Sequence, residues 1–327
     1  MELSRTINSD KRYYLDENTI ENTASFLQTM RVFNDAKIDL YNALYDQKYL
    51  ASGPLIDHAY PVFLKEKYKT NDYYNAAIYS AASGSISSQK ELKKYYSTTI
   101  TADLKTRDEK IQTIQEALDK KKAVKNSIRI YRKDGRWITP YPRCQMKVKG
   151  LMIVLFNKTI VKLDEYERSV EADIRKLTTR LALVTEARRQ KEKKLENIKN
   201  LPPERIVFGG KKLYSEKDTV GITKSAEDNK TSQKALKEWK QEFFEKRHQS
   251  MALPGRHTSK YGNFLCKYDG KDLSVACIDG TTTVFHDFKL PRYNEAFQRN
   301  FTCKPEDRQS ICYNFTVKRD RKNRQYI

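Results

Sequence analysis

Residues 163–200 read LDEYERSVEADIRKLTTRLALVTEARRQKEKKLENIKN. Apolar side chains recur along this stretch at three- and four-residue steps, the spacing of one helix face that packs against a partner. These positions are Leu163, Tyr166, Val170, Ile174, Leu177, Leu181, Val184, Leu195 and Ile198. Arg188 and Lys191 interrupt the pattern where apolar residues would continue it. The stretch therefore predicts one long helix with a single apolar seam that is broken in its second half.

A second long, charged helix is predicted over residues 101–130. Its apolar edge is formed by Leu104, Ile111, Ile114 and Leu118. Two such helices in one chain most simply form an antiparallel hairpin, here over about residues 101–200, and the break in the seam would let the tip of the hairpin carry cations. A structural coiled-coil protein would explain this region, but not the glycine-containing and strand-forming segments that follow it.

The most basic stretch, residues 118–149, lies between the two helices. It contains eleven lysines and arginines against Asp119 and Asp134, and aromatic residues are interleaved with the cations. Cations that neutralise phosphates beside aromatic rings that stack on bases are typical of RNA-binding surfaces. The candidate contacts are Arg129, Arg132, Lys133, Arg136 and Trp137. The alternative is a solvated hairpin with ordinary aromatic packing.

The net charge of the chain points to a polyanionic partner. The 327 residues include 63 basic and 42 acidic side chains, which gives a formal charge of +21. Residues 1–100 carry no net charge, whereas residues 101–200 carry +12 and residues 201–327 carry +9. Because binding to nucleic acid releases counterions, localised positive charge of this size favours a nucleic-acid partner over a merely soluble basic protein.

Neither a membrane span nor a secretory signal is evident. The longest apolar run, residues 150–156, is too short to cross a bilayer and fits a buried strand or a turn of core helix. The N-terminus lacks the apolar stretch of a signal peptide, so we expect a cytoplasmic protein, associated with the nucleoid if the source is prokaryotic.

The five cysteines include no C-x-x-C pair, and they are expected to be isolated thiols rather than zinc ligands.

The C-terminal third changes from a helical to a strand pattern. Short strands are predicted at residues 264–268, 273–278, 281–285 and 311–318, and two Asp-Gly pairs favour tight turns between the first three. A further strand is predicted near the N-terminus, at residues 3–7. We therefore expect an α+β fold in which a small antiparallel β-barrel carries a large inserted helical lobe. Other helices of that lobe are predicted at residues 16–49, at residues 59–68 and from residue 71 onward.

Two segments place glycines beside cations. They are FGGKKLY at residues 208–214 and PGRHTSKYGN at residues 254–263, separated by a helix predicted over residues 233–250. Glycine lets the backbone approach a phosphate closely, while lysine or arginine neutralises it. Together and in this order, the segments resemble the wedge region of the TnpB family, the transposon-encoded RNA-guided nucleases related to type V CRISPR effectors.

The resemblance covers nearly the whole chain and implies a domain plan. Residues 1–10 would supply the first strand of an oligonucleotide-fold-like wedge barrel, residues 11–200 the helical recognition lobe, and residues 201–327 the remainder of the barrel. In that family these regions bind the scaffold of a guide RNA and read a short motif in duplex DNA beside the target. The resemblance implies as nucleic-acid contacts Lys211, Lys212, Arg256, Lys260, Tyr261 and Asn263. The alternative is that Gly209, Gly210, Gly262 and Asn263 simply form turns.

The chain departs from the family where catalysis is concerned. The carboxylate triad that would hold two metal ions and the zinc-binding cysteine cluster are not recognisable in it. We therefore expect no catalytic residue, metal or cofactor in this chain, and a nuclease half that is missing or supplied as a separate C-terminal part. The alternative is a stand-alone regulator, derived from such a protein, that binds RNA or DNA without cutting it.

Overall fold

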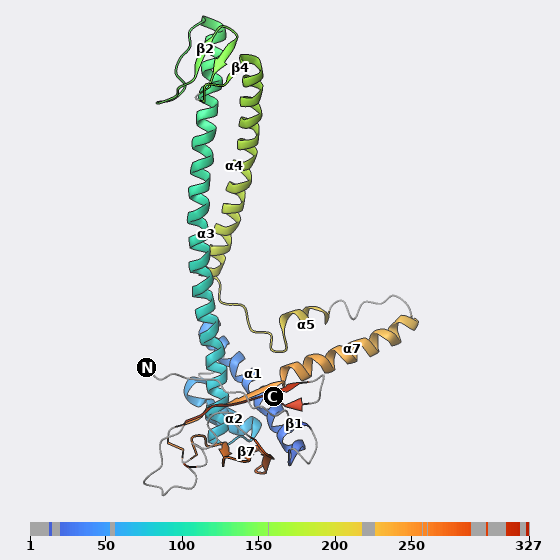
Figure 1. Cartoon of the computed structure of the whole chain (residues 1–327). Coiled ribbons are helices and arrows are strands. Elements are labelled where there is room, and N and C mark those ends of the chain that lie inside the picture. The colour runs from blue at the N-terminus through green and yellow to red at the C-terminus, as the bar shows by residue number, and fades with distance from the viewer. Residues whose placement is uncertain are drawn as a thin grey trace. The chain divides into compact units, whose positions relative to one another are not determined.

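The computed structural model describes residues 13–14, 20–52, 56–155, 157–217, 226–256, 258–259, 261–288, 299, 312–320 and 325–326. The chain divides into two compact units (Figure 1). The core unit comprises Met1–Gln89 and Glu204–Ile327, and the hairpin unit comprises Lys90–Pro203. The predicted lobe of residues 11–200 thus contributes to both units. The strand predicted within residues 1–10 lies outside the described residues.

The hairpin unit is built from α3 (Asp72–Asp134), which begins in the core unit, and α4 (Leu163–Asn200). The two helices are antiparallel: Lys191 bonds Asp103 at 3.0 Å, whereas Lys121 bonds Asp173 at 2.7 Å (Figure 1). Every apolar seam position predicted in α4 is buried or half-buried. The predicted hairpin is therefore confirmed.

The helix α3 is longer than predicted. The sequence suggested separate helices from residue 71 and over residues 101–130, but they form one helix of 63 residues. No proline interrupts this range, and Gly84 is its only glycine. A single glycine in a long helix costs about 1 kcal/mol and does not end it.

A three-stranded antiparallel sheet closes the far end of the hairpin unit. Its strands are β2 (Lys147–Lys149), β3 (Met152–Val154) and β4 (Ile160–Lys162), in that order. Val148, Ile153 and Val161 face an apolar cluster that also includes buried residues of α3 and α4. The apolar run of residues 150–156 therefore contributes a strand in which Ile153 is buried, whereas Leu151 and Met152 are exposed.

In the core unit, the helix α1 (Thr23–Tyr45) is the central element. It continues into a π-helical turn, Asp46–Leu50, and is followed by α2 (Ile56–Tyr68). Among the described residues, this unit also contains the helices α5 (Lys211–Ser215) and α7 (Ala226–Arg247). Phe26, Phe33, Leu40 and Tyr41 of α1 are at most 1% exposed, because α1 is covered by other elements on several sides.

Two sheets complete the core unit. The strands of the first sheet lie in the order β1 (Tyr13–Tyr14), β10 (Gln325–Tyr326), β9 (Phe315–Asp320) and β5 (Ser250–Leu253). The strands of the second sheet lie in the order β6 (Cys266–Tyr268), β7 (Leu273–Ala276) and β8 (Thr282–Phe285). All their described pairings are antiparallel. The Asp-Gly turns are confirmed, since Gly270 and Gly280 adopt φ values of +94° and +85° between consecutive strands. Residues 205–208 belong to none of the described strands.

The fold is mixed α and β, as predicted, but none of the described sheets closes into a barrel. The physical reason is the position of α1. The Phe26 ring of α1 packs edge-on against Phe285 of β8 at 5.2 Å, and the Asn34 amide donates to the Ser250 carbonyl of β5 at 2.9 Å. The described strands are two to six residues long. They pack around α1, which contributes side chains to the core of both sheets.

None of the described helices combines the length and the apolar character needed to cross a membrane. The four cysteines that the structure describes, Cys144, Cys266, Cys277 and Cys312, form no disulfide with one another. This agrees with the predicted isolated thiols.

Candidate nucleic-acid interface

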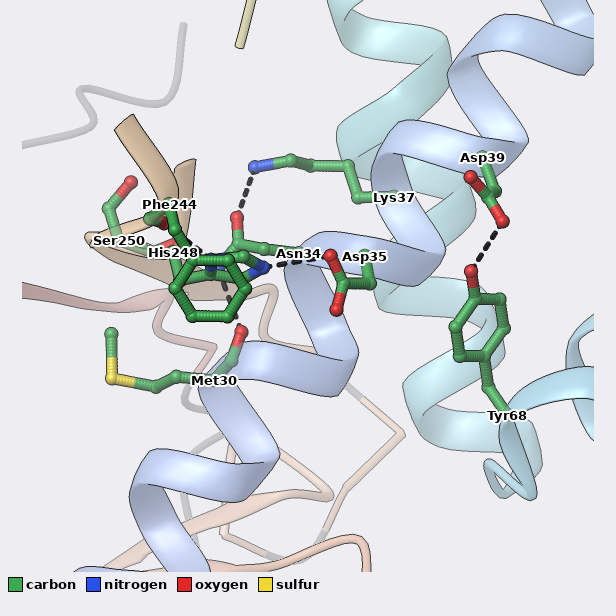
Figure 2. Close-up of polar contacts among 9 residues, drawn as sticks. All are labelled: Met30, Asn34, Asp35, Lys37, Asp39, Tyr68, Phe244, His248 and Ser250. Atoms are coloured by element: carbon green, nitrogen blue, oxygen red, sulfur yellow. Dashed lines mark hydrogen bonds and ion pairs between the residues drawn. The ribbon is translucent and has the colours of Figure 1, made fainter. Parts of the chain in front are cut away.

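Polar side chains of α1 contact the end of α7 and the start of β5. In the chain, these two elements lie between the two glycine-containing segments. Figure 2 shows Asn34 at the centre of this group. Its amide donates to the carbonyls of Met30 and Ser250, both at 2.9 Å, and its oxygen accepts from the Lys37 ammonium at 2.6 Å. Because Asn34 is fully buried, each of these bonds is made away from water, and breaking one leaves a costly unpaired group.

A second contact joins α1 to the end of α7. The ring of His248 lies 2.8 Å from the Asp35 carboxylate (Figure 2). Burial alone would raise the pKa of Asp35, but the hydrogen bond and charge of His248, with Arg247 and Arg31, lower it below its ordinary value. The contact is therefore made at neutral pH and is lost only as the solution becomes acidic.

The segment at residues 208–214, here called the first loop, is clamped between α1 and α7. The Phe208 ring lies 5.1 Å from that of Tyr41 and 5.5 Å from the Lys37 ammonium. Gly209 has a φ of +98°, and a Cβ built there would lie 2.9 Å from the Phe243 ring of α7. Only glycine satisfies both constraints, so Gly209 allows the close approach of α7.

The two lysines of the first loop differ in their surroundings. Lys211 bonds the Glu204 carboxylate at 2.5 Å, and this hydrogen bond lowers the pKa of Glu204. Lys212 is exposed and has no carboxylate partner among the described residues. The next residue, Leu213, is buried, and its carbonyl accepts the Trp239 indole N–H at 2.7 Å. The first loop is therefore mainly a packing element that leaves Lys212 available.

The segment at residues 254–263, here called the second loop, is a compact backbone turn. The Arg256 N–H donates to the Gly262 carbonyl, and the Gly262 N–H donates to the Ser259 carbonyl, both at 3.0 Å. A Cβ at Gly255 would lie 2.3 Å from the Tyr313 carbonyl oxygen and 2.6 Å from that of Gly262. Since backbone atoms cannot move aside cheaply, Gly255 is required for this turn. His257 and Lys260, a predicted contact, lie outside the described residues.

Asn263 organises the second loop from inside. It is 2% exposed. Its amide nitrogen donates to the carbonyls of Leu253 and Tyr313 at 3.0 and 3.3 Å, and its oxygen accepts from the N–H groups of Leu265 and Cys266 at 2.9 and 3.1 Å. All four hydrogen-bonding positions of the side chain are therefore occupied, which favours a turn-forming role for Asn263 over a nucleic-acid contact.

Exposed side chains on and beside the second loop include some that the sequence analysis missed. Arg256 is exposed, and among the described residues its guanidinium has no carboxylate partner. The exposed Lys267 places its ammonium 4.9 Å from the centre of the half-buried Tyr261 ring. Phe264 and Tyr73 stack at 4.4 Å and 15°, although they are 39% and 48% exposed. Such rings suit base stacking, and the only signal for them was an aromatic residue directly after the loop.

The aromatic residues at the far end of the hairpin unit are packed inward. We call residues 129–162 the tip. The Trp137 indole N–H donates to the Met146 carbonyl at 3.2 Å, and its ring meets that of Tyr131 edge-on at 6.4 Å. The Tyr131 hydroxyl donates to the Gly150 carbonyl at 3.2 Å. Both rings border the apolar cluster under the tip sheet. This arrangement favours ordinary aromatic packing for Trp137 over stacking on a base.

The cations of the tip point to a different role. Arg132 bonds the carboxylates of Asp164 and Glu167. Arg129, Lys133 and Arg136 are exposed, and no carboxylate of the described chain forms an ion pair with them. Five more exposed cations of the tip likewise have no carboxylate partner in the described part of the chain: Arg143, Lys147, Lys149, Lys158 and Lys162. The sequence analysis did not single out Lys158 and Lys162, which join the group only through the sheet β2–β3–β4.

Along the stem, four cations are paired across the two helices, whereas others, such as Lys105, Lys120 and Arg180, are exposed without an ion pair among the described residues. Lys121 and Lys125 of α3 bond Asp173 and Glu171 of α4, both at 2.7 Å. Arg188, one of the residues that breaks the predicted seam, bonds Asp108 of α3 at 2.5 Å. Lys191, the other, bonds Asp103. Cross-helix ion pairs therefore fill the gap in the apolar seam.

The predicted contacts thus fall into two groups that belong to different units. Lys211, Lys212, Arg256, Tyr261 and Asn263 lie in the core unit. The five predicted residues between positions 129 and 137 lie in the hairpin unit. Comparison of the chain with protein-family models, with curated proteins and with solved structures found no match.

Proposed function

We propose that this chain binds nucleic acid, and that the tip of the hairpin unit contacts the phosphate backbone. The observation that carries the proposal is the group of exposed cations, unpaired among the described residues, that the end of α3 and the sheet β2–β3–β4 bring together at the tip. Eight exposed tip cations have no described carboxylate partner, whereas four stem cations are paired across α3 and α4. Unpaired, closely spaced cations repel one another, and a polyanion relieves that repulsion while releasing its own counterions.

The chemistry of the tip favours phosphate over other anions. Arginine is well represented there, and its planar guanidinium forms paired hydrogen bonds with phosphate oxygens. The tip sheet contributes lysines from β2 and β4, on the face opposite the buried Ile153. Rows of cations on one sheet face suit the regular spacing of phosphates along a nucleic-acid strand.

We further infer that the chain is the nucleic-acid-binding part of a TnpB-like RNA-guided endonuclease. In this proposal the core unit corresponds to the wedge region, and the chain binds the scaffold of a guide RNA and target-adjacent duplex DNA. Cleavage would require the catalytic domain, supplied by a C-terminal nuclease half. The order of the two glycine-containing loops around α7 supports this assignment, as does the availability of Lys212 and Arg256. A stand-alone, non-cleaving regulator remains the second candidate, because the same cations would serve it equally well.

A pair of matched variants tests the binding proposal. Arg129→Gln/Lys133→Gln removes two tip cations from α3, and Lys121→Gln/Lys125→Gln removes two paired stem cations from the same helix. Affinity for a structured RNA is measured by fluorescence anisotropy over a range of salt concentrations. The tip variant should bind about tenfold more weakly at low salt and reduce the slope of log K against log salt by about 1.5, since each lost phosphate contact removes about 0.7–0.9.

The stem variant should change affinity less than about threefold, because its cations are already neutralised. Equal losses in the two variants would show that overall charge alone drives binding, and would refute the assignment to the tip.

Sequencing the RNA that copurifies with the chain separates the two candidate functions. One defined RNA species supports a guide-binding protein, whereas a heterogeneous population supports the regulator. Metal-dependent DNA cleavage by the pure chain would contradict both.

A further inference from the structure

The core unit contains a cavity that none of the roles above explains. It has a volume of about 400 Å³ and lies between the end of α1 with its π-helical turn and the part of α3 that belongs to the core unit. Its lining residues are Leu44, Gln47, Lys48, Tyr79, Ser83, Ile86 and Ser87. The volume falls in the range of small-ligand sites, about 300–1,000 Å³.

The cavity exists because α3 carries small side chains beside it. Residues 79–88 of α3 read YSAASGSISS. Serine and glycine are poorer helix formers than alanine or leucine, so this composition weakens the helix where it borders the cavity. A Cβ built at Gly84 would meet nothing within 4 Å, so larger side chains could be accommodated there. Within this run Ala82 packs into the core, whereas Ser83 and Ser87 border the cavity and do not fill it.

The lining combines three kinds of chemistry. Leu44 and Ile86 are 6% and 4% exposed, and they form an apolar floor. The Tyr79 ring is held by stacking on Tyr60 at 4.3 Å and 20°, so its orientation is fixed before any ligand arrives. Ser87 contributes a hydroxyl, Gln47 contributes an amide, and the Ser83 hydroxyl, which donates to the Ser80 carbonyl at 3.3 Å, contributes an acceptor oxygen.

The exposed Lys48 adds a positive charge to this lining. Among the described residues it has no carboxylate partner, and its ammonium lies 5.7 Å from the Tyr49 ring. An apolar ligand would not interact with the Lys48 charge or with the serine hydroxyls. A nucleotide uses all three kinds of group, because its base offers flat apolar faces and polar edges while its phosphate is anionic.

We propose that this cavity binds one unstacked nucleotide of the nucleic acid that the protein holds. The base lies against Tyr79, Leu44 and Ile86, its edge meets the serine hydroxyls and the Gln47 amide, and Lys48 contacts the adjoining phosphate. The inference rests on the proposed nucleic-acid binding, but it concerns the core unit and not the tip. Stacking on an aromatic side chain is worth about 1–3 kcal/mol per base, so the site adds affinity without dominating it.

The experiment places 2-aminopurine at successive positions of a bound RNA and follows its fluorescence, which rises when the base leaves the stack. The chain should raise the signal several-fold at one or two positions only. Ser83→Trp fills the cavity and should abolish that rise, whereas Ser88→Trp, on the same helix but outside the lining, should retain it. Total RNA affinity of Ser83→Trp should fall about five- to hundredfold, the equivalent of one stacked base.

A uniform 2-aminopurine response, or Ser83→Trp and Ser88→Trp that both behave as the unsubstituted chain, overturns the proposal while leaving RNA binding intact. Ser83→Leu replaces Ser83→Trp if circular dichroism shows that the latter does not fold. Should the chain bind no RNA, the proposed function fails and the cavity is tested directly with adenosine and uridine 5′-monophosphate. Saturable binding that Ser83→Leu removes supports a nucleotide site, and absence of binding at millimolar concentration overturns it.

Discussion

The two glycine-containing loops and the hairpin tip have similar residue types but different surroundings. In the loops, Gly209, Gly255 and Asn263 are confined by neighbouring backbone or aromatic atoms, and Lys211 bonds Glu204. In the tip, added Cβ atoms at Gly135 and Gly150 would meet nothing within 4 Å, and most cations lack a described carboxylate partner. A glycine beside a cation therefore indicates a phosphate site only when neither residue is already committed to packing.

The largest effect is expected for Gly255→Ala. The new Cβ would lie 2.3 Å from a backbone oxygen, so the turn at the second loop cannot form as it is, and the core unit should lose about 3 kcal/mol of its free energy of unfolding. Urea denaturation followed by Trp239 fluorescence measures the loss. Gly84→Ala, in open space on α3, is the control and should be neutral or slightly stabilising. A Gly255→Ala variant as stable as the control would mean that the second loop is not packed as described.

Asn263→Ala should be the next most damaging change, at about 2 kcal/mol. It removes two donated and two accepted hydrogen bonds inside the second loop, and the buried carbonyls and N–H groups lose their partners. The same denaturation experiment applies. Asn126→Ala, an exposed position on α3, should change stability by less than about 0.5 kcal/mol. If Asn263→Ala instead weakened RNA binding without loss of stability, Asn263 would be a contact rather than a packing residue.

A dependence of stability on pH is expected from Lys37. Burial lowers its pKa from 10.5 to about 8. Between these values the unfolded chain binds more protons than the native chain, so the free energy of unfolding contributed by this group rises as pH increases from 8 toward 10.5. Lys37→Met should remove that rise when denaturation is measured across the same range. An unchanged pH profile in Lys37→Met would show that the ammonium is not desolvated against Phe208 and Asn34.

The smallest effects separate two exposed cations of the loops, Arg256 and Lys211. Arg256→Gln should weaken RNA binding about threefold, because no described carboxylate neutralises Arg256, whereas Lys211→Gln should change it less than twofold. Both should alter stability by less than about 0.5 kcal/mol, since the residues lie on the surface. Anisotropy at fixed salt measures both. A larger loss for Lys211→Gln would reverse the assignment of available and committed cations.

Much of the architecture could be predicted from local pattern. The helix at Leu163–Asn200 has the bounds that its apolar spacing indicated, and the Asp-Gly turns lie between consecutive strands as expected. The continuity of α3 was missed because the helical patterns from residue 71 and over residues 101–130 were interpreted as two helices. The predicted closed barrel was wrong for the described strands. Hydrophobic periodicity indicates where strands form, but it does not indicate that they pack around the helix α1.

The sequence by itself determined the hairpin, the turns and the excess of positive charge, since these follow from spacing and composition over a few residues. Only the tertiary structure decided which cations are neutralised and which polar side chains are buried. Arg188 and its partner Asp108 are 80 positions apart, and the Asn34 amide reaches Ser250 across 216 positions. Ion pairing and burial depend on such distant neighbours, so the residues left available for a ligand emerge only when the chain has folded.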